Sequence, residues 1–271
     1  MLTIRRIRHA REFALVAILV GAVPAALSAQ ELEARGAEAN YTYVGADYSY
    51  ANFQGDIDPW HLAALSLGRV TEAGSFIARV NWAERFGSSG IQAEGDAYPS
   101  LGEHTYAYLN TGYSGASIFP QWRFGGEIFR SLPRAWEASL GFRQLRFGGP
   151  PVTLFTGSVG KYRGNYWFSL RPYIRDKQNG VSASASLSVR RYYADSDHYI
   201  GGRIGYGSAP GEQVTTVELT RLNSATAVIQ GSRTLASRVI GSWSLTYEHE
   251  EIAVGRFRSR WEVSGGAKLR F

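Results

Sequence analysis

The sequence predicts an all-β fold, namely a transmembrane antiparallel up-and-down β-barrel of about 14 strands, with 12 strands as the alternative. Three observations predict this fold. From residue 41 onward, segments of ~10 to 13 residues alternate apolar and polar side chains and are separated by clusters of turn-forming residues. The polar face carries charges of both signs at mid-strand, which is typical of a hydrated lumen. The chain ends on Phe271 at the tip of an alternating apolar row, and such a terminal strand is an assembly signal for the barrel-assembly machinery.

The first 29 residues predict export from the cytoplasm. Four arginines between positions 5 and 11 precede an apolar run of eleven residues, Phe13–Val23, and small residues follow as far as Ala29. This run is far shorter than the ~20 residues of a membrane-spanning helix, so the pattern indicates a signal peptide cleaved before Gln30. We expect a signal peptide over 1–29, a short periplasmic lead-in over 30–40 and one barrel over 41–271 in the outer membrane of a Gram-negative bacterium.

Composition excludes several classes of protein. The chain has no cysteine, which excludes a disulfide scaffold, a thiolate metal site and a cysteine nucleophile. An aromatic content of 13% argues against a disordered chain. No run of basic residues follows the predicted signal peptide, so nucleic acid is not an expected partner. No cofactor or metal is implied.

The alternation is clearest over residues 136–146. Trp136, Leu140 and Phe142 fall on one face, and Glu137 and Arg143 fall on the other. A soluble β-sandwich alternates as well, but tryptophan and tyrosine near the strand ends favour membrane interfaces. The aromatic residues expected in these interfacial girdles are Tyr41, Tyr43, Trp60, Trp82, Trp136, Tyr192, Tyr193 and Trp261.

An even strand number places both termini of the barrel in the periplasm, with short turns at that end and longer loops outside. We expect longer outer connections at 51–59, 114–120, 209–221 and 251–255. The alternating segment Val214–Leu219 is assigned to a hairpin within an outer loop, because a fifteenth strand would make the number of strands odd. The expected strands are 41–50, 60–70, 75–86, 90–99, 104–113, 121–131, 136–147, 152–162, 165–176, 180–192, 198–208, 222–234, 238–250 and 256–271.

Several stretches resemble the YaiO family of outer-membrane β-barrel proteins. They are 136–143 (WEASLGFR), 156–162 (TGSVGKY), 164–167 (GNYW), 170–173 (LRPY), 190–193 (RRYY), 205–207 (GYG) and 247–251 (YEHEE). The resemblance covers about residues 40 to 271. It implies an outer-membrane barrel, and it brings no activity or catalytic residue that can be carried over.

Charged side chains on the predicted lumen face are the best candidates for a functional site. They come from consecutive strands and are Arg123, Glu127, Glu137, Arg143, Arg171 and Arg190. Arginine forms bidentate pairs with carboxylates and keeps its charge in a confined space. These groups either pair to fill and rigidify the barrel or form a constriction that selects small polar or anionic solutes.

Tyr173 and Trp167 share the polar face with Arg171, and aromatic rings beside arginine suit a path for sugars. Alternatively they plug the lumen, or they belong to a girdle if the register slips by one residue. Pro172 lacks a donor for the ladder in mid-strand, which predicts a bulge that would produce such a slip.

The sequence gives little indication of a histidine that binds a cation or takes part in hydrolysis. Glu248 and Glu250 face one side of a strand and His249 the other, so one cation cannot easily use all three. A hydrolase would need a serine, a histidine and an orienting group at one end of the barrel, and no Gly-x-Ser-x-Gly motif occurs.

The leading hypothesis is therefore a narrow passive channel or export conduit for small polar solutes or saccharides, and not an enzyme. A structural or docking barrel with a plugged lumen is the alternative, and a membrane-embedded hydrolase is a third. The expected partners are outer-membrane lipid, lipopolysaccharide and the barrel-assembly machinery.

Overall fold

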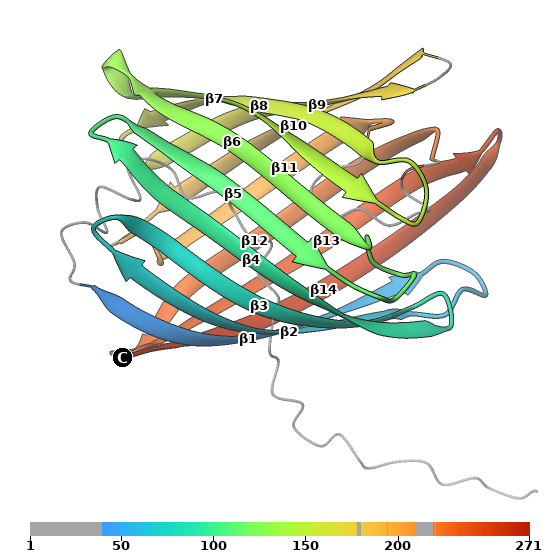
Figure 1. Cartoon of the computed structure of the whole chain (residues 1–271), viewed down its shortest axis with the longest axis horizontal. Coiled ribbons are helices and arrows are strands. Elements are labelled where there is room, and N and C mark those ends of the chain that lie inside the picture. Colours follow the sequence, from blue (N-terminus) through green and yellow to red (C-terminus); the bar gives the residue numbers. More distant parts are fainter. Residues whose placement is uncertain (1–39, 178–179, 194, 210–218, 220) are drawn as a thin grey trace, which may run out of the picture.

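The computed structural model describes residues 40–177, 180–193, 195–209, 219 and 221–271. The signal peptide and nearly all of the lead-in predicted for residues 1–40 lie outside the described residues, as does most of the hairpin expected at 214–219. Fourteen antiparallel strands form a single closed barrel (Figure 1). This confirms the predicted strand number, and because the first hairpin belongs to the sheet, the alternative of 12 strands is wrong.

The strands follow one another around the barrel in chain order, and β1 pairs with β14 to close it. A single 3-10 turn, Pro133–Ala135, joins β6 to β7. The strands are β1 (Tyr41–Phe53), β2 (Trp60–Thr71), β3 (Gly74–Arg85), β4 (Ser88–Gly102), β5 (Thr105–Tyr113), β6 (Trp122–Leu132), β7 (Trp136–Arg146), β8 (Val152–Arg163), β9 (Tyr166–Lys177), β10 (Gly180–Tyr192), β11 (Tyr199–Gly207), β12 (Asn223–Ala236), β13 (Val239–Ala253) and β14 (Arg256–Arg270).

We call the end of the barrel that carries Tyr41 and Phe271 the turn end, and the opposite end the loop end. Connections at the turn end are short, and the connections after β1, β5 and β11 at the loop end are longer. The longer connection expected at 251–255 is not found, because β13 continues to Ala253 and β14 begins at Arg256. In the described part of the chain, no helix is long and apolar enough to cross a membrane.

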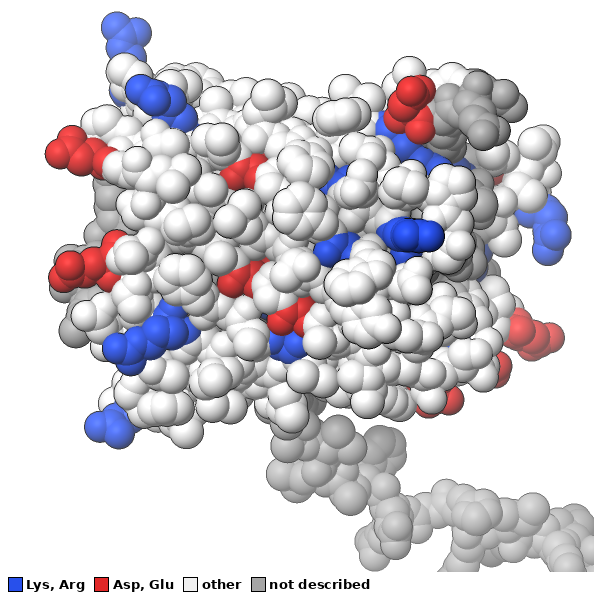
Figure 2. Space-filling view, viewed as in Figure 1, with Lys and Arg blue, Asp and Glu red and all other residues white. Residues whose placement is uncertain are grey.

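Alternation along each strand separates an apolar outer face from a polar lumen. On the outer face the exposed fraction of Leu140 is 76%, whereas that of Glu127 on the lumen face is 2%. Exposed leucine, isoleucine, valine and phenylalanine side chains surround the barrel in this way, as a lipid-facing band requires. Figure 2 shows charged side chains protruding at the two ends, and smaller charged patches between the uncharged side chains of the middle.

The predicted aromatic girdle is correct only in part. Trp82, Trp136 and Trp261 are exposed on the outer face, whereas Tyr43 and Trp60 are buried in the lumen with exposed fractions of 7% and 2%. Nearness to a strand end was the basis of the prediction, but the alternation along β1 and β2 decides which face these two rings occupy.

The bulge predicted at Pro172 is absent. The pairing of β9 with β10 keeps one register through Ala185 and Pro172, and the pairing of β9 with β8 has the same register on both sides of the proline. The outward-facing proline therefore removes a donor without shifting the strand. Tyr173 and Arg171 remain on the lumen face.

Candidate functional site

The strand alternation brings all the charged candidates from the sequence to the lumen wall. Glu127, Glu137, Arg143 and Arg190 are buried, and Arg123 and Arg171 are partly exposed to the lumen. Small residues give the arginine stems room. A Cβ atom at Gly125 would stand 2.6 Å from Cδ of Arg143, so glycine is needed where this side chain crosses the neighbouring strand.

Glu127 on β6 is the centre of the first ion-pair network. Its carboxylate accepts a hydrogen bond from Nη2 of Arg143 at 2.9 Å and one from Nη1 of Arg171 at 2.8 Å. The hydroxyl of Ser139 donates to the same carboxylate at 2.5 Å. The Glu127 side chain is fully buried. One carboxylate therefore binds two arginines at once.

Arg123 belongs to a second network on the β3–β6 wall. Its Nη1 lies 2.6 Å from Oε1 of Glu94, and Arg79 contacts both Glu94 and Asp96, at 3.2 Å and 3.4 Å. Asp96 also accepts hydrogen bonds from Tyr108 and Asn110. Two arginines and two carboxylates balance here, so this wall is electrically neutral and well supplied with hydrogen bonds.

The remaining candidates lie on β7, β9 and β10, around Arg190. The guanidinium of Arg190 stacks over the rings of Trp167 and Tyr199, with its Cζ 5.3 Å and 4.5 Å from the ring centroids. Glu137, Tyr173 and Trp167 line the same cavity as Arg190. Arg171 also lines this cavity, so it connects the Arg190 group to the Glu127 network.

A third network near the loop end was not among the predicted site residues. Arg221 lies 2.8 Å from Glu248 and 3.0 Å from Glu250, Arg260 lies 2.6 Å from Glu248, and Arg258 pairs with Glu250. The signal for this network was present in the sequence. Two acids and two arginines alternate on either side of the last hairpin, and the register places Glu248 opposite Arg260 and Glu250 opposite Arg258. His249 faces outward, as the sequence predicted.

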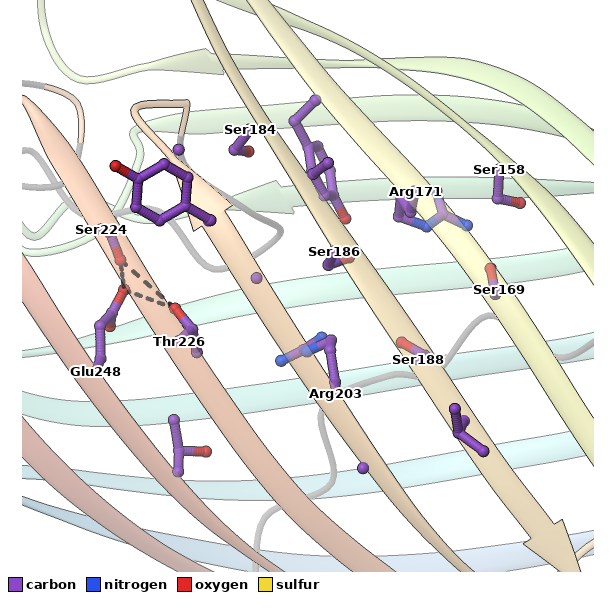
Figure 3. Close-up of a pocket in the computed structure, with 18 of the residues that line it drawn as sticks. Ser158, Ser169, Arg171, Ser184, Ser186, Ser188, Arg203, Ser224, Thr226 and Glu248 are labelled. Atoms are coloured by element: carbon purple, nitrogen blue, oxygen red, sulfur yellow. Dashed lines mark hydrogen bonds between the residues drawn. The ribbon is translucent and has the colours of Figure 1, made fainter.

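Strands β8–β14 enclose most of a lumen cavity of about 220 Å³. Serine hydroxyls supply much of its surface, and Figure 3 shows Ser184, Ser186 and Ser188 in a row along one strand, with Arg171 and Arg203 on either side. Five arginines and three glutamates line the cavity, and two of these arginines, Arg171 and Arg221, also pair with Glu127 and Glu250 beside it. The charged residues of the lining are Arg171, Arg190, Arg203, Arg221, Arg260, Glu137, Glu248 and Glu262.

Arg203 and Glu262 differ from the other charged residues of this cavity. Neither forms a hydrogen bond or an ion pair with any described residue, and both are partly exposed to the lumen. Arg203 lies opposite Ser188 in the β10–β11 pairing. The positive charge of Arg203 is therefore available to a solute, whereas the charges of Arg171, Arg221 and Arg260 are compensated by carboxylates.

Both mouths of the barrel are narrowed by inward-folded segments. At the loop end, Ile118 and Phe119 of the β5–β6 connection pack against Ala83 inside the mouth. Leu219 of the β11–β12 connection packs against Leu145 and Leu154, which belong to β7 and β8. A Cβ atom at Gly90 would lie 2.2 Å from Cβ of Ala116, so glycine at this position allows the β5–β6 connection to enter the lumen.

The turn end is narrowed by an ion pair and by aromatic rings. Arg270 of β14 pairs with Asp197 of the β10–β11 turn. Because β12 and β13 separate the strands that carry them, this pair crosses part of the mouth. Rings of Tyr98, Tyr106, Tyr108 and Phe129 form a buried cluster on the other side.

The described residues include no group of three or more histidine, aspartate or glutamate side chains that could hold a metal ion. The acids of the third network are instead engaged by arginines. Phe271, the predicted assembly signal, has an exposed side chain. Its backbone exchanges two hydrogen bonds with Thr42, at 3.0 Å and 2.9 Å, next to the β1–β14 seam. Its role in assembly stays a prediction.

A closed antiparallel barrel with an apolar outer face and a charged, hydrated lumen defines an integral membrane β-barrel protein. The family comparison specifies it further. Residues 41–212 match the model of the YaiO membrane beta barrel domain. The chain belongs to this family, and it is an outer-membrane β-barrel protein. No curated protein matches the sequence.

Solved structures of similar fold include three with TM-scores above 0.5. The "CymD monoaromatic hydrocarbon channel" has a TM-score of 0.56 and 10% identity, with 90% of this chain and 93% of that chain covered. The "Bacterial polysaccharide outer membrane secretin" has a TM-score of 0.52 and 5% identity, with coverages of 86% and 98%. The Acinetobacter baumannii outer membrane protein Omp33 has a TM-score of 0.51 and 11% identity, with coverages of 86% and 99%. At these identities the likeness shows the fold alone.

Proposed function

We propose that the protein is a narrow passive channel or export conduit for small polar solutes or saccharides, with a preference for anionic solutes. The observation that carries the proposal is the serine-lined lumen cavity of about 220 Å³, in which Arg203 has no ion-pair partner among the described residues. Hydroxyl groups replace the water around a polar solute, and an uncompensated arginine attracts an anion. The three solved barrels named above support the barrel architecture and do not identify the solute.

The geometry of the ion pairs supports an open lumen. Glu127 and Arg143 lie on the adjacent strands β6 and β7, and Glu248 and Arg260 lie on the adjacent strands β13 and β14. These networks extend over neighbouring strands, with Arg171 of β9 reaching Glu127 of β6 and Arg221 of the β11–β12 connection reaching Glu248 of β13. They hold the arginine heads against the wall, which stiffens the barrel and leaves the cavity between them free for solute.

A plugged structural or docking barrel is the second candidate, and the narrowed mouths favour it. Ile118, Phe119 and Leu219 occupy part of the loop-end mouth, and the Arg270–Asp197 pair crosses part of the turn end. In this candidate, the lumen networks serve stability and the loops carry recognition. The two candidates differ in one measurable property, the passage of solute.

One histidine–serine hydrogen bond bears on the hydrolase hypothesis. Nδ1 of His249 lies 2.8 Å from Oγ of Ser259 near the loop end. The pair faces outward, away from the lumen cavity. Among the described residues, no carboxylate or amide forms a hydrogen bond with the second ring nitrogen of His249, so the pair lacks the orienting group that nucleophilic catalysis requires. We therefore propose a non-enzymatic role.

Liposome swelling tests the proposed passage of saccharides. Vesicles that contain the refolded protein are expected to swell in an isotonic monosaccharide, and to swell more slowly in a trisaccharide, because a narrow lumen selects by size. Protein-free vesicles and vesicles with heat-unfolded protein are the controls. Swelling no faster than the controls in either sugar would contradict the channel and favour the plugged barrel.

A further inference from the structure

Basic side chains surround the turn end of the barrel. They stand on the outer face or in the turns of β2, β6–β8, β10 and β12–β13. We call these residues the basic rim, and they are Arg69, Arg130, Arg134, Lys161, Arg163, Arg191, Arg233 and Arg238. Figure 2 shows several of the molecule's lysine and arginine side chains protruding along the left-hand end, where Figure 1 places the C-terminus.

No residue of the basic rim forms an ion pair with a described residue. The contacts of Arg69, Lys161 and Arg191 are with neutral groups. Nη1 of Arg69 donates to the Thr42 hydroxyl at 2.8 Å. Lys161 lies over the Trp136 ring, and Arg191 lies over the rings of Tyr166 and Tyr193. Stacking on interfacial aromatic rings holds these cationic heads at the level of lipid headgroups.

The loop end has the opposite composition. Its exposed described acids are Asp56, Asp58, Glu84 and Asp176, and its exposed arginines are Arg146 and Arg256. At the turn end, the exposed acids are Glu72, Glu103 and Asp195, fewer than half the number of basic rim residues. The outer surface is therefore polarised, with its positive charge at the end where the strand-number rule places the periplasm.

An apolar groove of about 580 Å³ lies beneath the rim at Arg69. Leu67, Phe76, Leu109 and Phe124, all exposed on the outer face, line it. Arg69 and Thr42 belong to the same lining. A hydrophobic groove with a guanidinium at its headgroup end matches the chemistry of a phospholipid, with an acyl chain below and a phosphate above.

We propose that the basic rim binds anionic phospholipids of the periplasmic leaflet, with one acyl chain seated in the groove under Arg69. The phosphate of such a lipid accepts hydrogen bonds from arginine, and its net negative charge offsets the uncompensated charge of the rim. The stacked Lys161 and Arg191 supply further headgroup contacts around the barrel. This interaction is independent of whether the lumen conducts.

Native mass spectrometry of the detergent-purified protein tests this inference. The protein is incubated with equal amounts of phosphatidylglycerol and phosphatidylcholine, and the lipid retained after delipidation is compared. We expect several-fold greater retention of phosphatidylglycerol. The variant Arg69→Gln, Lys161→Gln, Arg191→Gln is expected to lose most of that preference, because it removes three cationic heads while the strands stay paired.

The matched control is Arg146→Gln, Arg256→Gln, which removes exposed arginines from the loop end. It is expected to keep the wild-type preference. Heat-modifiable migration in gels shows that each variant is folded, and a second rim variant, Arg130→Gln, Arg163→Gln, replaces the first if that one fails to fold. Equal retention of the two lipids, an equal loss in the loop-end control, or a stronger retention of lipid A than of phosphatidylglycerol would overturn the proposal.

Discussion

Glu127→Ala is expected to lower the free energy of unfolding by about 3 kcal/mol. The carboxylate of Glu127 is fully buried and forms ion pairs with both Arg143 and Arg171. Its removal takes away the carboxylate that these two guanidinium groups share, and it also removes an acceptor of the Ser139 hydroxyl. The lumen admits water to part of Arg171, which limits the penalty to the lower part of the range for buried pairs. Urea titration of the refolded protein, followed by tryptophan fluorescence, measures the change.

In the same urea titration, two further variants distinguish the loss of the Glu127 charge from the loss of its side-chain volume. Glu127→Gln keeps a carbonyl acceptor of similar volume and is expected to lose less stability than Glu127→Ala. Glu262→Gln changes a lumen carboxylate that has no ion pair among the described residues, and its effect is expected to stay within about 0.5 kcal/mol. Equal stability of Glu127→Ala and the wild-type protein would show that the network contributes nothing to the fold.

Arg203→Glu is expected to abolish the anion preference of the channel. Among the described residues, the other arginines of the cavity lining contact carboxylates or aromatic rings, and this substitution turns the one unpaired positive charge into a negative one. The effect is large because Arg203 has no ion pair with a described residue, so its charge acts on the solute and on no neighbouring carboxylate. The measurement is the reversal potential under a KCl gradient at low ionic strength, where screening is weakest.

Glu262→Gln is the matched variant with the opposite sign. It removes a carboxylate from the same cavity and is expected to strengthen the anion preference. Arg146→Gln at the loop-end rim, outside the cavity, is expected to leave the reversal potential unchanged. If Arg203→Glu and Glu262→Gln shift the potential in the same direction, the selectivity does not arise from the charge balance of this cavity.

The architecture was largely readable from the sequence, because alternation with a period of two is a direct consequence of strand geometry. Residues 136–146 illustrate this. The same alternation that exposes Leu140 to lipid buries Glu137 and Arg143 in the lumen. Strand number followed from the parity rule and from turn residues between the segments. The strand ends shifted where pairing continued past the polar clusters, as in β13, which reaches Ala253.

The candidate site could be predicted only in part from the sequence, because it depends on which side chains contact one another across strands. The Glu127 network joins β6 to β7 and β9, and Arg171 reaches past β8 to contact the carboxylate. The register of a single hairpin predicts neighbours on adjacent strands and does not predict such a reach. The Glu248 and Glu250 network also needs Arg221 from a loop connection, and no strand pattern places that residue inside the lumen.

The narrowing of the mouths could not be predicted from the sequence. The loops fold inward through side-chain packing, and such packing leaves no periodic pattern in the sequence. Phe119 and Leu219 are apolar residues in segments that the parity rule assigns simply to loops. Their burial inside the barrel makes the diameter of the open path a property of the loops. For this reason the strand pattern alone leaves an open channel and a plugged barrel undistinguished.

Single-channel recording from the refolded, purified protein in a planar lipid bilayer tests the central claim most directly. We predict steady, discrete current steps, small because both mouths are narrowed, with a reversal potential that shows anion preference. The preparation is first shown to be folded by its heat-modifiable migration in gels. A folded protein that inserts into the bilayer and gives no current steps would contradict the channel, and the lumen networks would then serve a structural barrel.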